Sequence, residues 1–212
     1  MHSKRGLPLL CSKIRLRRRH LYGQLDTGNR QIRLLTLKPK DVQDATLDCT
    51  LEIASLNDEP DYSALSYVWG DPKITKTIRV NGCAIPVTAN LEAALKRIRD
   101  KGSGWAKGRI WIDAVCTNQS DIAERNAQVA MMCDIYQHAR KVIVWLGETG
   151  TDGMTTENVA RGMSIISSWR GLNYNELAQS IEHFKTHQPD QHERNARSLA
   201  ALLRADYWTR TW

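Results

Sequence analysis

The chain has 212 residues, enough for one domain with a substantial core, and its 42% hydrophobic and 25% charged residues are ordinary for a globular protein. The longest apolar run, "VIVWL" at 142–146, is far shorter than the ~18 residues that a membrane-spanning helix needs, so we expect no membrane segment. The net charge of +7 comes entirely from seven Lys and Arg residues within positions 1–20. The rest of the chain is balanced, which argues against a nucleic acid as the main ligand.

Residues 1–20 are expected to form a basic, disordered N-terminal arm, with a nuclear or mitochondrial targeting segment as the alternative. The five cysteines are odd in number and include no Cys-x-x-Cys pair. This pattern predicts neither a disulfide framework nor a zinc ribbon, and it favours a reducing compartment such as the cytoplasm. His183 and His187 have helical spacing, but no third ligand accompanies them, so no metal site is expected.

The first part of the core contains three expected strands. Residues 30–39 and 45–56 show short alternating stretches with β-branched residues. Residues 63–69 form a short apolar run that is closed by Gly70, Asp71 and Pro72, which predicts a buried strand ending in a sharp turn.

A hairpin and a helix are expected next. Asn81-Gly82 lies between two apolar stretches, and this dipeptide is the strongest short-range signal for a two-residue hairpin turn. Residues 88–100 then place apolar side chains on one face, with Asn90 as the expected N-cap and with Gly102 and Gly104 ending the helix.

The segment from 110 to 146 is expected to form a strand, a helix and a strand. Residues 110–115 predict the first strand, and residues 142–146 predict the second. In the intervening helix, Asp121 and Glu124 have the spacing of a capping box. An apolar stripe on this helix is expected to face the core: Ile122, Val129, Met132, Cys133, Tyr136 and Ala139.

Together these elements predict an α/β fold with a mainly parallel sheet flanked by helices and an inserted β-hairpin, because helical patterns precede the second and third buried strands. Residues 154–205 show three helical segments and predict a helical C-terminal extension. The expected division is therefore the arm at 1–20, a core domain at 21–150 and a helical part at 151–212.

The ends of the three buried strands are rich in polar and turn residues, at 69–71, 116–121 and 147–150. In a parallel α/β sheet, ligands bind beyond the carboxyl ends of the strands. One interpretation is a cleft in which the amides of Asn118 and Gln119 and the free N–H groups of the next helix hold a polar or phosphorylated ligand.

Glu124 is the candidate general acid or base of such a cleft, and Gln128 lies one turn further along the same side of the helix. The structural alternative is that Asp121 and Glu124 cap the helix while the two amides form a turn. Asp113 is expected inside the strand, where it either faces solvent or is buried and paired with a donor.

Three blocks of the sequence resemble a known family in order and spacing. They are "YSALSYVWGDP", "IRVNGCAIPVTANLEAALKRIR" and "RIWIDAVCTNQSDIAERNAQVAMMCDIYQHARKVIVWLGE". Together with the preceding segment "RQIRLLTLKP", they resemble the fungal heterokaryon incompatibility (HET) domain over roughly residues 22–150. HET domains are implicated in non-self recognition between fungal cells and in the programmed cell death that follows.

HET domains are distantly similar to TIR domains, so the resemblance implies a TIR-like, flavodoxin-like sheet. It also implies a death-signalling module that binds a protein partner or self-associates. Some TIR domains cleave NAD with a glutamate in a helix near the domain's end, which makes NAD the candidate substrate. Glu124 is the candidate catalytic residue as the best carboxylate remaining in this sequence, because the late glutamate that would correspond to the TIR residue is not in it. The remaining cleft and family-motif residues are Tyr67, Trp69, Gly70, Asp71, Asp113, Asn118, Gln119, Asp121 and Gln128.

HET sequences usually continue from a Trp-Thr-Arg-x-Trp block into a Gln-Glu pair, whereas this chain ends "YWTRTW" at Trp212. A truncated chain is therefore expected, and the assignment of enzymatic activity stays open. Three hypotheses follow: a signalling interaction module, an NAD-cleaving hydrolase, and an inactive truncated relative. If Glu124 is catalytic, Glu124→Ala should abolish cell killing with little loss of stability.

Overall fold

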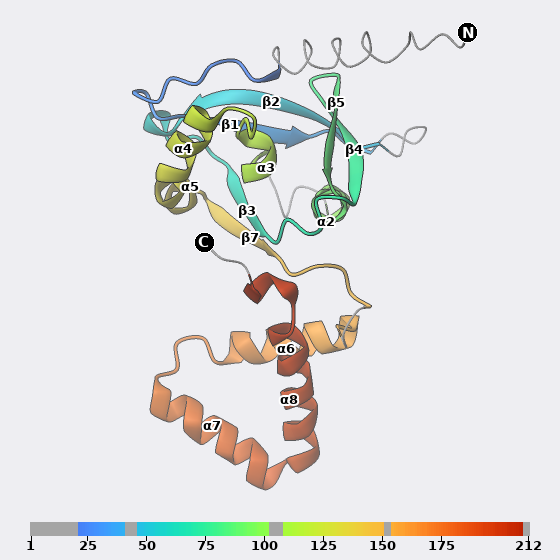
Figure 1. The fold of residues 1–212 in the computed structure, drawn as a ribbon. Helices are drawn as coiled ribbons and strands as arrows, with labels where there is room; N and C mark the ends of the chain where they lie inside the picture. Colours follow the sequence, from blue (N-terminus) through green and yellow to red (C-terminus); the bar gives the residue numbers. More distant parts are fainter. Residues whose placement is uncertain (1–20, 41–45, 102–107, 151–153, 210–212) are drawn as a thin grey trace, which may run out of the picture. The chain divides into compact units, whose positions relative to one another are not determined.

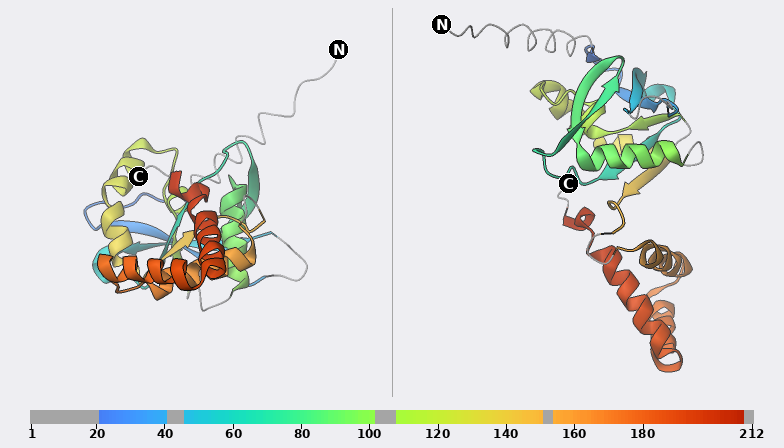
Figure 2. Two further views of the ribbon diagram at one scale, coloured as in Figure 1. Left: turned by 90° about the horizontal axis from the view of Figure 1, so that it is seen from below. Right: turned by 90° about the vertical axis from the view of Figure 1, so that its right-hand side faces the viewer.

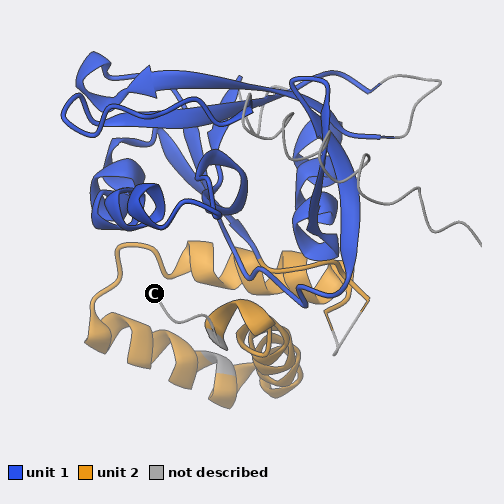
Figure 3. Ribbon diagram, turned by 45° about the horizontal axis from the view of Figure 1, so that its top comes forward, with its two compact units in different colours: residues 1–145 blue, residues 146–212 orange. Residues whose placement is uncertain are grey.

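The computed structural model describes residues 21–40, 46–101, 108–150 and 154–209. The expected N-terminal arm, the glycines at 102 and 104, and the end of the chain at 212 lie outside these ranges. The chain divides into two compact units, Met1–Trp145 and Leu146–Trp212, which are coloured separately in Figure 3. Each unit is described by itself.

Unit 1 is built on a seven-stranded sheet with the order β5-β4-β2-β1-β6-β3-β7 (Figure 1). The strands are β1 (Gln31–Leu37), β2 (Asp48–Ser55), β3 (Ser63–Tyr67), β4 (Thr75–Val80), β5 (Cys83–Thr88), β6 (Arg109–Trp111) and β7 (Lys141–Trp145). A short 3-10 helix, η1 (Leu56–Asp58), follows β2. The expected α/β class is therefore confirmed.

The sheet is mixed, so the prediction of a mainly parallel sheet is wrong. β3 runs parallel to both β6 and β7, and β2 runs parallel to β4. The pairings of β1 with β2, β1 with β6, and β4 with β5 are antiparallel. The difference arises because β1 and β2 occupy the middle of the sheet, whereas periodicity alone does not reveal which strands become neighbours.

The predicted hairpin is confirmed, and its turn joins β4 to β5. Asn81 and Gly82 have φ values of 48° and 74°, the positive values that a two-residue turn of this kind requires. The following helix, α2 (Ala89–Asp100), packs against β4 and β5 (Figure 2). Its N-cap is Thr88, whose hydroxyl accepts a hydrogen bond from Leu91 N, and not Asn90 as expected.

Three short helices follow β6: α3 (Asp113–Cys116), α4 (Ile122–Ala130) and α5 (Met132–His138). The strand expected at 110–115 ends at Trp111, and Asp113 begins α3, so the placement of Asp113 inside the strand is wrong. Its Oδ1 accepts a hydrogen bond from Ala114 N at 2.8 Å, which favours a helix start over an extended strand. The single helix expected at 121–141 is divided at Met131.

The core-facing stripe expected on the single helix is confirmed only beyond Met131, where Met132, Tyr136 and Ala139 pack against the core, and it is wrong on α4. Ile122 and Val129 are 65% and 58% exposed, whereas Gln128 is 1% exposed. The inward face of α4 is the polar one because it meets charged and polar partners on β1, which are described below.

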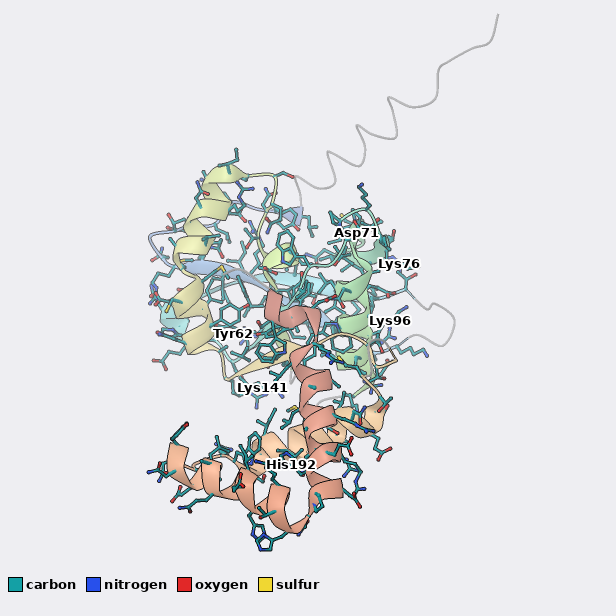
Figure 4. All side chains as sticks on the ribbon, turned by 60° about the horizontal axis from the view of Figure 1, so that its bottom comes forward. Tyr62, Asp71, Lys76, Lys96, Lys141 and His192 are labelled. Atoms are coloured by element: carbon teal, nitrogen blue, oxygen red, sulfur yellow. The ribbon has the colours of Figure 1, made fainter. Side chains whose placement is uncertain are left out.

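The interior of unit 1 is apolar around β3, with Leu65, Ile110 and Trp111 essentially inaccessible. Tyr62, labelled in Figure 4, is also buried, and its hydroxyl donates to the carbonyl of Ile135 in α5 at 2.5 Å. This bond ties the start of β3 to the helix that precedes β7.

Unit 2 is helical, as expected, and contains α6 (Thr156–Ser168), α7 (Tyr174–His187), α8 (Pro189–Leu203) and the 3-10 helix η3 (Asp206–Thr209). α6 crosses α8 closely at Gly162, where an added Cβ would lie 2.5 Å from Leu202 Cδ1 and 3.1 Å from Ser198 O. Within the described ranges, no helix is long and apolar enough to cross a bilayer.

Candidate functional site

The ends of β3 and β6 are joined by a small polar cluster. Trp69 Nε1 donates to Asp113 Oδ2 at 2.8 Å, and Gln119 Nε2 donates to the backbone carbonyl of Asp113 at 2.8 Å. Three of the predicted cleft residues are therefore brought together by α3. Trp69 remains 44% exposed, so the cluster lies at the surface of unit 1.

The segment after β3 forms the expected sharp turn. Tyr67 is buried at the end of the strand, and Gly70 has φ of +78°, a conformation that residues with a side chain rarely adopt. Asp71 is exposed, and its Oδ1 accepts a hydrogen bond from Lys73 N at 2.8 Å. Asp71 thus stabilises the turn, which positions Trp69.

Asn90, expected only as an N-cap, connects α2 to two strand ends. Its Nδ2 donates to Val68 O at 2.6 Å, and its Oδ1 accepts from Trp145 Nε1 at 2.8 Å. The side chain thereby holds the segment after β3 and the end of β7 in place. The sequence offered no local signal for this role because its partners lie 22 and 55 residues away.

A cavity of about 990 Å³ lies beside the loop between α3 and α4. Its lining residues are Tyr22, Ile85, Pro86, Ala114, Asn118, Gln119, Ser120, Asp121, Ile122 and Ala123. Three predicted cleft residues, Asn118, Gln119 and Asp121, therefore share one cavity. The opposite wall comes from the β5 strand of the hairpin, which was expected only to decorate the sheet.

The loop at the cavity is ordered by its own side chains. Asn118 Oδ1 accepts from Ser120 N at 3.2 Å, and Asp121 Oδ1 accepts from Glu124 N at 3.1 Å. Asp121 is therefore the N-cap of α4, as expected. The second half of the capping box is absent because Asp121 N donates to Asn118 O at 3.0 Å and the Glu124 carboxylate points elsewhere.

The carboxylate of Glu124 forms a buried ion pair with Arg33 of β1. Arg33 Nη1 and Nη2 donate to Glu124 Oε1 and Oε2 at 2.6 and 3.0 Å, and Asn118 N donates to Oε1 at 2.6 Å. The side chains of Arg33 and Glu124 are 1% and 10% exposed. Such a bidentate pair in a buried site is strong once formed, and losing either partner leaves a buried charge unpaired.

Arg33 also contacts three other parts of unit 1 around this ion pair. Its guanidinium also donates to Cys116 O at 3.1 Å and to Gly23 O at 2.5 Å, and it lies 5.0 Å from the ring centroid of Tyr22. Arg33 was not predicted as a site residue. The signal available in the sequence was a basic residue inside the apolar run "QIRLLTL", which requires a buried partner if the strand is central.

Gln128 faces the same strand as Glu124. It is buried, and its Nε2 donates to Gln31 O at 3.0 Å. The expectation that these two side chains share one side of the helix is met, and that side packs on β1. Among the predicted carboxylates, Asp121 rather than Glu124 lines the cavity.

Cys116 is the last residue of α3, and its side chain is buried. Burial raises the pKa of its thiol to about 12, and its Sγ accepts a hydrogen bond from Ile112 N at 3.2 Å. The thiol is therefore neutral at physiological pH and contributes no nucleophile to the cavity.

The fold and the site define an α/β domain in which loops after β3 and β6 build a polar surface cluster and an adjoining cavity. A family model described as "Heterokaryon incompatibility protein (HET)" matches residues 62–212. The chain belongs to the heterokaryon incompatibility (HET) family, which confirms the resemblance found in the sequence.

A curated relative is 38% identical over 138 residues: "Heterokaryon incompatibility protein 6, OR allele" of Neurospora crassa. The alignment covers 60% of this chain and 20% of the relative, so it spans about a fifth of the relative's length. No solved structure matches the chain.

Proposed function

We propose that this chain acts in fungal non-self recognition, as a HET module that triggers programmed cell death by binding a partner domain or a second copy of itself. The observation that carries the proposal is the family match over residues 62–212, supported by the Neurospora crassa relative whose name describes heterokaryon incompatibility. A cytoplasmic site of action is part of the proposal and rests on the cysteine pattern of the sequence.

The contacts of Glu124 favour an interaction module over an enzyme that uses this residue. Both carboxylate oxygens are bound, one by Arg33 Nη1 and Asn118 N and the other by Arg33 Nη2. A general base must reach the proton that it abstracts, and Glu124 would have to break the ion pair to do so. The residue therefore supports the fold around the loop.

Inducible expression of the chain in a filamentous fungus tests the proposal, with viable colonies counted after induction. Killing is expected from the parent chain and not from Leu65→Asp, which places a carboxylate at a fully buried position of β3 and prevents folding. Full viability while folded parent chain accumulates would contradict the proposed function.

The relation to TIR domains belongs to the same proposal. Three adjacent parallel strands, β6-β3-β7, support it because TIR-like folds are built on a parallel sheet. The antiparallel pairings of β1 with β2 and with β6 lie outside this parallel block.

A second candidate function is cleavage of NAD, and the cavity is the observation that favours it. At about 990 Å³ it is large enough for a ligand of dinucleotide size, with Ile85 and Ile122 as apolar walls and Asp121 as a lining carboxylate. Nicotinamide release from NAD by the purified chain tests this function. Asp121→Asn should then reduce turnover, whereas Asp71→Asn, in the exposed turn after β3, should not.

A further inference from the structure

The cavity beside the loop between α3 and α4 has a one-sided charge composition. Among the described residues that line it, Asp121 carries the one formal charge, and no lysine, arginine or histidine is present. The side chains of Asn118, Gln119 and Ser120 add neutral polar groups. A site that holds phosphate groups normally supplies arginine or lysine side chains to them. The described lining therefore favours ligands without negative charge.

The carboxylate of Asp121 is left for a ligand to contact. Its Oδ1 accepts a hydrogen bond from Glu124 N at 3.1 Å, and its Oδ2 accepts none from the described residues. No lysine or arginine in the described part of the chain forms an ion pair with it, including Arg125 one turn further along α4. The guanidinium of Arg33 is held by Glu124 and does not offset this charge.

The position of Asp121 also determines the charge at the start of α4. Asp121 is the N-cap of this helix, so its full negative charge lies against the positive end of the helix dipole. That end is equivalent to roughly half an elementary charge. The local balance is therefore negative, and the helix start does not act as an anion site.

The rest of the lining is apolar and suits a flat apolar group. Ile85 and Pro86 of β5 form one wall, and Ala114, Ile122 and Ala123 contribute from α3 and α4. Ile122 is 65% exposed, so its side chain is not committed to the core and is available to a ligand. The volume of about 990 Å³ lies at the upper end of the range for small-molecule pockets.

We propose that this cavity binds organic cations with a flat apolar body and that it excludes anions. The positive head group contacts the Asp121 carboxylate, and the apolar body lies against Ile85 and Ile122. The inference rests on the proposed function and deepens its second candidate, because it defines which part of a substrate the cavity holds. The phosphate groups of a dinucleotide then lie outside the cavity.

Three probes of nearly equal size and shape test this charge selection. Benzamidine, benzamide and benzoate are a cation, a neutral molecule and an anion at neutral pH. Their dissociation constants are measured by NMR titration of the full chain at low salt, following the backbone amides of residues 118–123. Benzamidine should bind at least about tenfold more tightly than benzoate, with benzamide between them, because the carboxylate attracts one head group and repels the other.

Asp121→Asn isolates the effect of the charge. Asparagine caps a helix about as well as aspartate, and its amide oxygen can still accept from Glu124 N, so the fold around the loop is kept. The dissociation constants of the three probes should then agree within about twofold. Asp71→Asn is the matched control, because Asp71 is exposed in the turn after β3 and does not line the cavity. This control should retain the order of the parent chain.

Equal or tighter binding of benzoate by the parent chain overturns the inference, as does the absence of shifts at 118–123 with every probe at about 20 mM. An order that survives in Asp121→Asn overturns the role of this carboxylate. These results are separable from NAD cleavage, which is read from nicotinamide release. A chain that prefers benzamidine and releases no nicotinamide would remove that second function and leave the cation site intact.

Discussion

Replacing Glu124 with alanine should destabilise unit 1 severely, because the change leaves the buried Arg33 guanidinium without its carboxylate partner. The variant loses two ion-pair hydrogen bonds and the bond from Asn118 N. Arg33 is 1% exposed, so water cannot replace the carboxylate without opening the structure. Removing one partner of a buried ion pair costs about 3–5 kcal/mol, a large part of the roughly 5–15 kcal/mol that stabilises a domain.

Urea unfolding followed by far-UV circular dichroism measures this loss. With a slope near 2 kcal/mol per molar urea, the midpoint should fall by about 1.5–2.5 M. The matched control is Glu157→Ala on α6, which removes an exposed carboxylate from its pair with Arg161 at 3.1 Å and should cost at most about 0.5 kcal/mol. A midpoint for Glu124→Ala within about 0.5 M of the parent would refute the structural role assigned to this residue.

Three further predictions concern separate parts of the chain. Gly162→Ala should lower the melting temperature of unit 2, because its Cβ meets α8 and overpacking costs about 1–3 kcal/mol; a calorimetric scan checks this. At pH 8, iodoacetamide should label the exposed Cys133 rapidly and Cys116 only after unfolding, since burial raises the pKa of Cys116 to about 12; mass spectrometry of peptides distinguishes the two. Trp69→Phe should cost about 1 kcal/mol in urea unfolding by removing the donor to Asp113, and an unchanged midpoint would show that this bond contributes nothing.

The features that the sequence predicted correctly depend on local chemistry. Asn81-Gly82 specifies its turn because both residues adopt positive φ, and the three helical segments of unit 2 follow from spacing within each segment. Asp121 caps α4 because its acceptor lies three residues from the donor.

The features that the sequence predicted wrongly depend on distant partners. The burial of Gln128 and the exposure of Ile122 follow from Arg33, which lies 91 residues from Glu124 along the chain. A periodicity argument assumes that the apolar side of a helix faces the core, and here a buried arginine reverses that preference. The antiparallel pairing of β1 could not be predicted from the sequence for the same reason. The pairing of a strand depends on its neighbours in the sheet and not on its own residues alone.

In the candidate site, too, the local features were predicted and the long-range ones were not. The sequence identified the loop that lines the cavity at Asn118, Gln119 and Asp121, because polar residues directly follow an apolar run. The sequence could not predict that Ile85 and Pro86 form the opposite wall, because the folding of the hairpin brings them to the cavity.

The most direct test of the central claim is fungal viability after expression of the double variant Arg33→Met/Glu124→Leu. An apolar pair of similar volume can replace a buried ion pair without unfolding a protein, so the variant removes the carboxylate. Circular dichroism has to show that the fold is kept, because Gly23 O, Cys116 O and Asn118 N lose their side-chain partners in this variant. An interaction module predicts killing equal to that of the parent chain. Loss of killing by a folded, accumulating variant would show that the Glu124 carboxylate acts chemically, and would contradict the account.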